Sequence, residues 1–90
     1  MSIQENFLRF HKENPHVYEM FKRFAFDAIE AKLKTLSANF IFERIRWETD
    51  VVTKGDQFKL NNNYRAYYAR MFMDQYPNAP EFRIREQVAA

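Results

Sequence analysis

The strongest constraint on the fold of this chain is an apolar stripe that begins at Val17 and ends at Ala31. Its members recur at three- and four-residue steps, which is the spacing of one face of an α-helix. The preceding Asn14-Pro15 pair favours a helix start, because asparagine caps helices and proline suits the first helical position. The sequence therefore predicts a helix over residues 16–34. The stripe comprises Val17, Met20, Phe21, Phe24, Ala28 and Ala31.

Three further helices are predicted from local signals. Residues 3–12 are expected to form a short first helix. Ser37 is a preferred cap residue for a helix over residues 38–48. The three consecutive asparagines at 61–63 cap a last helix over residues 64–76, which a proline then ends because the residue before proline disfavours helical backbone.

A small β element is expected in the second half of the chain. Residues 51–52 are β-branched, Gly55 suits a turn, and residues 58–60 alternate apolar and polar side chains. Residues 51–60 therefore indicate either a hairpin or an extended loop. Residues 81–85 alternate in the same way and are a candidate partner strand for residues 58–60.

Together these elements predict a mainly α fold with a small β element, in one compact domain over residues 1–90 with residues 87–90 frayed. The element order resembles a winged helix-turn-helix, with residues 64–76 as recognition helix and residues 81–85 as wing. The connection over residues 49–62 departs from that layout, because the motif has a turn of about three or four residues. An inserted hairpin would account for the difference.

The composition excludes several functional classes. The chain has no cysteine, which excludes disulfide scaffolds and thiolate zinc sites. Its single glycine excludes the glycine-rich loops that cradle phosphates. His11 and His16 fit no standard zinc spacing, and neither a Ser-His-Asp nor a Cys-His arrangement is available. We therefore predict a non-enzymatic protein without a metal or a cofactor.

Membrane insertion and secretion are not expected. No apolar run approaches the roughly 20 residues that cross a membrane. Residues 1–6 lack the basic flank and the apolar run of a signal peptide. The expected location is therefore the cytoplasm.

Five short blocks follow one another along the chain: residues 7–12, 14–18, 44–48, Lys59-Leu60-Asn61-Asn62-Asn63 and 68–73. In these blocks the chain resembles a family of short phage- and prophage-encoded proteins that carry them in the same order. The resemblance covers nearly the whole chain. It implies a phage or prophage source, an accessory role rather than a part of the virion, and the host cytoplasm as location. It implies no activity and assigns no residue role.

The first functional hypothesis is DNA binding. The formal net charge is +2, and the excess lies after residue 53, where six basic residues face four acidic ones. A capped helix that offers free N–H groups at its start and arginines along its length suits phosphate contacts. The same features also describe an ordinary capped helix with arginines in solvent. The candidate DNA-binding residues are Lys54, Lys59, Asn61, Asn62, Asn63, Arg65, Arg70, Arg83 and Arg85.

The alternative is a protein-binding modulator or inhibitor of a host enzyme or defence complex. Arg44 and Glu48 have the spacing of a helical ion pair, and Trp47 is placed to stack on Arg44 or Arg46. Tryptophan and arginine often anchor interfaces. The same residues also fit a partly buried tryptophan with arginines that extend to solvent, and a homodimer that buries them is a third arrangement. The candidate interface residues are Phe26, which lies off the apolar stripe, and Phe40, Arg44, Arg46 and Trp47.

Overall fold

The computed structural model describes residues 2–33, 35–53 and 60–82, and within them the chain is mostly helical. This confirms the predicted mainly α fold. A π-helical segment continues the third α-helix, and a short 3-10 turn leads into the fourth. The elements are α1 (Ile3–Glu13), α2 (Pro15–Glu30), α3 (Ala38–Trp47), the π-helix η1 (Glu48–Thr53), the 3-10 turn η2 (Asn62–Tyr64) and α4 (Arg65–Gln75).

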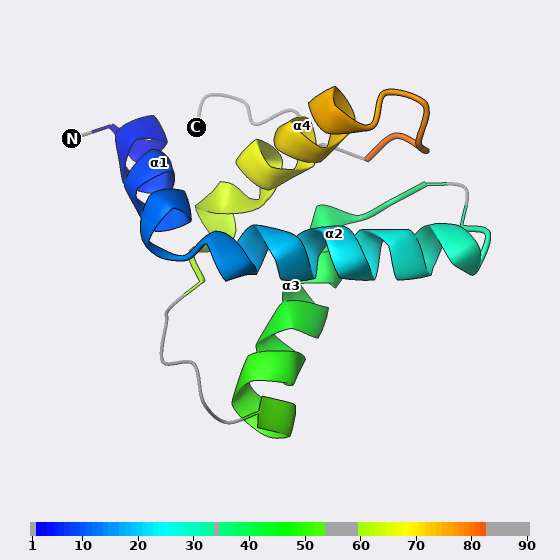
Figure 1. Ribbon diagram of the computed structural model, residues 1–90, viewed down its shortest axis with the longest axis horizontal. Coiled ribbons are helices and arrows are strands. Elements are labelled where there is room, and N and C mark those ends of the chain that lie inside the picture. The colour runs from blue at the N-terminus through cyan, green and yellow to red at the C-terminus, as the bar shows by residue number, and fades with distance from the viewer. Residues whose placement is uncertain (1, 34, 54–59, 83–90) are drawn as a thin grey trace.

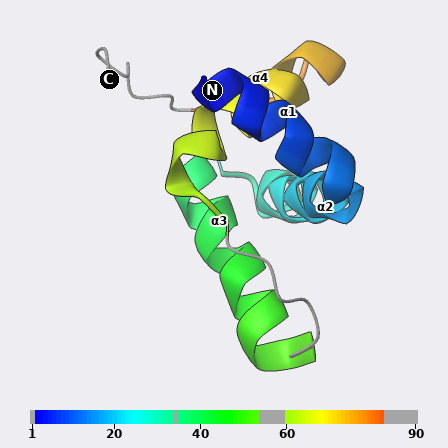
Figure 2. The same ribbon diagram turned by 90° about the vertical axis from the view of Figure 1, so that its left-hand side faces the viewer.

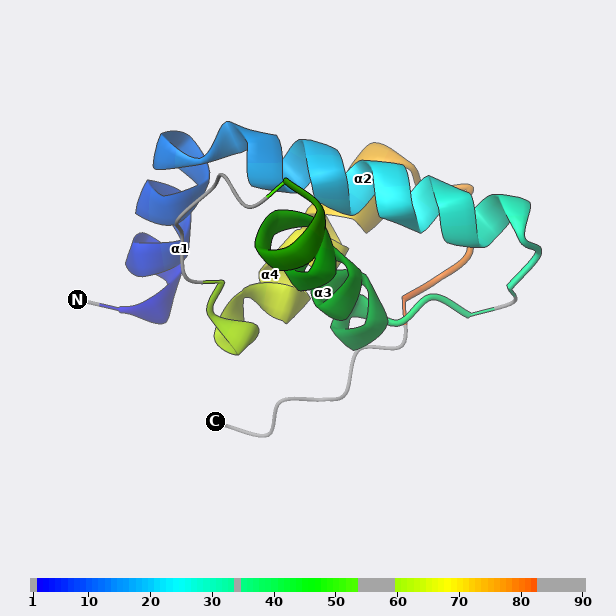
Figure 3. The ribbon, with the colours of Figure 1, turned by 90° about the horizontal axis from the view of Figure 1, so that it is seen from below.

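Helix α2 lies at the centre of the arrangement and packs against the other three α-helices. In Figure 1, α1 and α4 lie above α2, and α3 extends below it. Figure 2, turned by 90°, shows α3 and η1 projecting away from the other helices. In Figure 3, seen from below, α3 points toward the reader and covers part of α4, which it also contacts. The distal end of α3 and η1 is therefore the most protruding described part of the chain.

The apolar stripe forms the buried face of α2 as far as Ala28, whereas Ala31, its last predicted member, follows the helix and is exposed. Val17, Phe21 and Phe24 are buried, and Ala28 packs at the edge of the core. The helix ends earlier than predicted, at Glu30, because Lys32 adopts a left-handed backbone with φ of 64°.

The end of α2 is a Schellman motif. The N–H of Lys32 donates to the carbonyl of Ile29 at 2.9 Å, and the N–H of Leu33 donates to that of Ala28 at 3.2 Å. These two bonds satisfy carbonyls that a helix end leaves without partners. Glycine is the usual residue at the left-handed position, because a Cβ atom there is crowded against the following carbonyl.

Two cap residues behave differently from each other. The hydroxyl of Ser37 accepts a hydrogen bond from the N–H of Phe40 at 3.2 Å, which confirms the predicted cap of α3. The predicted side-chain cap at Asn14 was wrong: the Asn14 amide donates instead to the carbonyl of Phe10 at 3.1 Å, where it closes α1. Pro15 still begins α2, because its fixed φ suits the first helical position.

The predicted hairpin or extended loop was wrong at Val51 and Val52, because both residues lie in the π-helix η1. The buried face of α3 continues into η1 through Thr49, which is 6% exposed and donates its hydroxyl to the carbonyl of Arg46 at 3.3 Å. This anchor extends the helix past Trp47, and the β preference of two exposed valines is too weak to oppose it. Residues 54–59, the rest of the expected hairpin or loop, lie outside the described residues.

The β structure of the described residues is a single parallel bridge between Leu36 and Phe82. The N–H of Leu36 donates to the carbonyl of Glu81 at 3.1 Å. Phe82 is buried and stacks on Phe21 at 5.3 Å between ring centroids. The expected pairing of residues 58–60 with 81–85 lies mostly outside the described residues.

The core is built around the ring of Tyr68, which is fully buried on α4. It contacts Phe7 of α1 at 4.9 Å, Tyr18 of α2 at 6.0 Å and Phe42 of α3 at 6.0 Å between centroids. Burial raises the pKa of Tyr18 to about 12, so its hydroxyl keeps its proton and donates to Oε1 of Gln75 at 2.7 Å. The hydroxyl of Tyr68 is also buried, but no described residue hydrogen-bonds to it.

Replacing Lys32 with Gly should stabilise the protein. Glycine has no Cβ atom, so it relieves the crowding at the left-handed position. Part of this stabilisation is lost, because glycine also makes the unfolded chain more flexible. We expect the free energy of unfolding to rise by about 0.5–1 kcal/mol. Urea denaturation followed by circular dichroism measures it. The control Glu30→Gly, inside α2, should lower stability by a similar amount; destabilisation by Lys32→Gly would contradict the motif.

Replacing Tyr68 with Phe should leave stability unchanged or raise it by up to about 1 kcal/mol. The change keeps the ring at the centre of the core and removes a hydroxyl that is buried without a described partner. The matched change Tyr18→Phe removes the hydrogen bond to Gln75 and should cost about 1 kcal/mol. Chemical denaturation of both variants separates the two cases, and a large loss in Tyr68→Phe would mean that its hydroxyl has a partner.

Candidate functional site

The three asparagines form the turn that starts α4. The Oδ1 atom of Asn61 accepts a hydrogen bond from the N–H of Asn63 at 2.9 Å, and its carbonyl accepts from the N–H of Tyr64 at 2.9 Å. Tyr64 is buried against Phe10, with ring centroids 5.3 Å apart. Asn61 therefore has the capping role that was predicted, on the 3-10 turn η2 rather than directly on α4.

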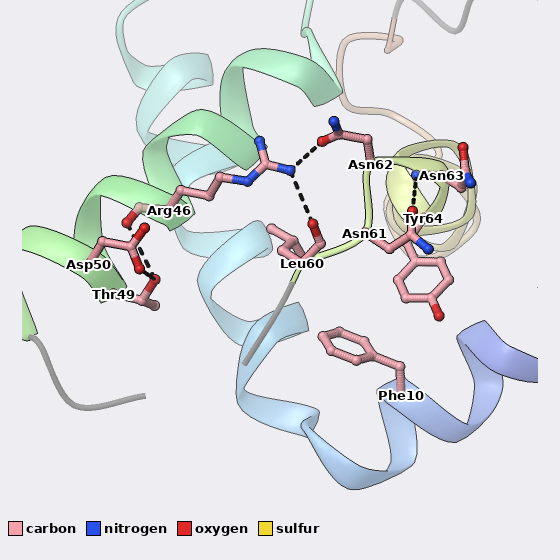
Figure 4. Close-up of a pocket in the computed structure, with 9 residues that line it drawn as sticks. All are labelled: Phe10, Arg46, Thr49, Asp50, Leu60, Asn61, Asn62, Asn63 and Tyr64. Atoms are coloured by element: carbon pink, nitrogen blue, oxygen red, sulfur yellow. Dashed lines mark hydrogen bonds between the residues drawn. The ribbon is translucent and has the colours of Figure 1, made fainter. Parts of the chain in front are cut away.

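Asn62 lies between two arginines from different parts of the fold. Nη2 of Arg46 donates to the Oδ1 atom of Asn62 and to the carbonyl of Leu60, the latter at 3.1 Å. Nε of Arg65 donates to the carbonyl of Asn62 at 2.9 Å, and its Nη1 to Oδ1 of Asn39 at 2.7 Å. We call Arg46, Asn62 and Arg65 the arginine clamp. It joins α3 to the start of α4, and Figure 4 shows the part of it that Arg46 and Asn62 form.

The clamp changes the interpretation of the candidate DNA-binding residues. The structure does bring Asn61, Asn62 and Arg65 together. The side-chain oxygens of both asparagines, and Nε and Nη1 of Arg65, form hydrogen bonds within the protein. Asn63 and Arg70 are exposed, and the Arg70 guanidinium lies over the ring of Tyr67 at 6.0 Å. The remaining candidates, Lys54, Lys59, Arg83 and Arg85, lie outside the described residues.

Charges of both signs occur on every described α-helix. On α2, for example, Lys22 pairs with Glu19 at 3.2 Å. On α3, Arg44 pairs with Glu48 as predicted, at 3.1 Å, and Glu43 pairs with Arg46 at the same distance. The described charges are therefore interspersed, and phosphate recognition calls for a continuous basic face instead.

A pocket of about 840 Å³ opens beside the clamp. Phe10, Leu60 and Tyr64 form its apolar base (Figure 4), and α3 with η1 adds polar groups from Arg46 and Asp50.

Among the described residues, no group of three or more His, Cys, Asp or Glu side chains is placed to hold a metal ion. Within those same residues, none of the helices is long and apolar enough to cross a membrane.

An apolar patch lies on the outer face of α3 and η1. Phe40 is 65% exposed and Trp47 is 58% exposed, and Val51 continues the same face at nearly half exposure. The opposite face, with Phe42 and Ile45, is completely buried. We call Phe40, Arg44, Trp47 and Val51 the α3 patch. Sequence reasoning identified its first three members but missed Val51, which it placed in a hairpin or an extended loop.

The predicted stacking of Trp47 on its neighbouring arginines was wrong. The Arg44 guanidinium lies over the ring of Phe24 at 4.6 Å, and that of Arg46 lies over Phe42 at 5.9 Å. The fifth candidate interface residue, Phe26, packs instead against α4 and the residue after it, with its ring 5.3 Å from Phe72 and 4.9 Å from Tyr76. The candidate interface residues therefore do not form one surface.

No known protein family, characterised protein or solved structure matches this chain.

Replacing Arg46 with Ala should destabilise the fold, because it frees the carbonyl of Leu60 and separates α3 from the start of α4. Hydrogen bonds from a charged donor contribute about 1.5–3 kcal/mol each, and partial exposure reduces that here. We expect a loss of about 1–2 kcal/mol in urea denaturation.

Two controls make that result specific. Arg46 reaches Glu43 through Nη1 and both Leu60 and Asn62 through Nη2. Arg46→Lys keeps the charge but has a single nitrogen, so it should recover only part of the loss. Arg70→Ala, on the exposed face of α4, should change stability by less than about 0.5 kcal/mol. Equal effects of Arg46→Ala and Arg70→Ala would argue against the clamp.

Proposed function

We propose that this protein is a small, non-enzymatic accessory factor that acts by binding another protein chain through the α3 patch. The observation that carries the proposal is the exposure of Phe40 and Trp47 on a helix whose opposite face is fully buried. A single exposed apolar residue is common on protein surfaces, whereas aromatic residues aligned on one helical face mark interaction sites.

The composition of the patch supports protein recognition. Tryptophan and arginine are the residues most often found at the energetic centres of protein interfaces, and Trp47 has Arg44 next to it on the same face. Arg44 is held in place by Glu48 and by the ring of Phe24. A partner would therefore meet an arginine that is already ordered, which lowers the entropy lost on binding.

The way in which α3 is attached to the rest of the protein also favours protein recognition. The projecting end of α3 is accessible (Figure 2), and the bonds from Arg46 to Leu60 and Asn62 hold it to the start of α4. A protruding helix that is rigid at its base suits insertion into a groove or pairing with another helix. A phage or prophage source and a location in the cytoplasm agree with this role and belong to the same proposal.

DNA binding remains the rival hypothesis. Its strongest sequence argument was the arginine- and asparagine-rich start of the last helix. Arg65 and Asn62 contribute to the clamp, so a phosphate would have to compete with their bonds inside the protein. The rival then rests on Asn63, Arg70 and four residues outside the described part of the chain.

The proposal is tested by placing a photo-crosslinking amino acid at residue 40 or 47, in cells that produce the protein. We expect a defined crosslinked protein from both positions. The matched control is residue 8, since Leu8 on α1 is also about half exposed but lies outside the patch. The purified partner should bind the wild type, and the double change Phe40→Ser with Trp47→Ser should weaken its affinity at least tenfold.

Two results would contradict the proposal. The first is a partner that binds the double variant as tightly as the wild type while circular dichroism shows the same helix content in both. The second is salt-dependent binding to duplex DNA that Arg70→Ala abolishes and the double variant retains, because that behaviour belongs to phosphate neutralisation.

A further inference from the structure

The four members of the α3 patch are spaced symmetrically along the helix. From Phe40 through Arg44 and Trp47 to Val51 the steps are four, three and four residues, which read the same in both directions. This is the narrow seam of a coiled coil, not the wider face of a core helix. A π turn bonds five residues back rather than four, so Val51 stays near the side of Trp47 although it lies in η1.

On this basis, and resting on the proposed function, we infer that the chain covering the α3 patch is a second copy of this protein, paired with the first in antiparallel orientation. A two-fold axis that passes between residues 45 and 46 would place the seam of one copy against the seam of the other. Symmetric pairing of this kind is the commonest form of protein association, and it requires a surface that is complementary to its own rotated copy.

The residues that this axis brings together are chemically complementary. Phe40 of one copy faces Val51 of the other, so a large side chain meets a small one in each outer layer. Arg44 faces Trp47 in each inner layer, which forms a cation–π contact across the interface. The Arg44 side chain is 46% exposed, and its bond to Glu48 orders it. The exposed face of its guanidinium is therefore available to the Trp47 indole of the other copy.

The flank of the seam limits the strength of the pair. Glu43 and Asp50 lie on the same side of the seam, so the acidic groups of the two copies approach each other there. Arg46 offsets the charge of Glu43 within each copy. A seam of four layers is shorter than standard interfaces, so we expect a dissociation constant on the order of 10–100 μM, with tighter pairing at higher salt.

The association itself is measured by sedimentation equilibrium from about 1 to 500 μM. Trp47 is the only tryptophan of the chain, so its fluorescence emission should shift to shorter wavelength over the same range. Trp47→Ala and Arg44→Glu should each weaken association at least tenfold, whereas Leu8→Ala should not change it. A wild type that stays monomeric, or a Trp47→Ala variant that associates normally, would overturn the inference.

The orientation is tested with cysteines, which the natural chain lacks. Phe40→Cys and Val51→Cys proteins are mixed at 200 μM and oxidised gently. Antiparallel pairing should yield mainly the mixed disulfide between residues 40 and 51, identified by mass spectrometry of the digested dimer. A majority of 40–40 and 51–51 disulfides would overturn the inference.

This design separates the inference from the proposed function. A monomeric protein that still gives crosslinks to another protein from residues 40 and 47 would overturn the second-copy inference alone. A monomeric protein without such crosslinks would overturn both.

Discussion

The fold depends on the packing of one ring, that of Tyr68, against rings from each of the other α-helices. Phe7, Tyr18 and Phe42 bring α1, α2 and α3 to it, so a single residue of α4 joins all four helices. Aromatic pairs contribute roughly 0.5–1.5 kcal/mol each beyond the area that they bury. In so short a chain, which buries a modest fraction of its surface, such contacts carry a large part of the stability.

This central contact also explains why α3 projects. Phe42 and Ile45, in the middle of α3, are fully buried, whereas the helix continues past them through Trp47 into η1. Beyond Ile45 the hydrogen bonds to the rest of the protein come from Arg46, which donates to Leu60 and Asn62. The arginine clamp therefore fixes the distal end of α3 to the rest of the protein, as the aromatic core fixes its middle.

Sequence reasoning succeeded where the determining interactions are local. The stripe of α2, the Ser37 cap and the Arg44–Glu48 pair involve residues within a few positions of each other. It failed where distant residues decide: the Arg46 guanidinium finds its acceptors 14 and 16 residues away, at Leu60 and Asn62. No periodicity or capping rule predicts such a contact, so Arg46 was placed with the candidate interface residues.

The errors at η1 and at Asn14 have a different cause, because the deciding contacts there are local. Two valines have a local preference for strand, but the buried Thr49 continues the core-facing side of α3 and keeps the backbone helical. Asn14 has the right residue type for a cap, but its side-chain N–H donates to the carbonyl of Phe10 at the end of α1, and its oxygen makes no cap bond to α2. In both cases the residue preference was read correctly, but another contact three or four residues away decided the local structure.

The exposed aromatic residues of α3 are hard to explain by stability alone. The core already contains the rings of Phe21, Phe42, Tyr68 and Phe72, and each of these is completely buried. Phe40 and Trp47 are mostly exposed, so they add little to the apolar area that folding removes from water. Polar residues at these positions would keep the helix and improve solubility. A surface that retains large rings at a regular helical spacing gains free energy only when another chain covers them, and this is the physical basis for assigning the function of the protein to α3.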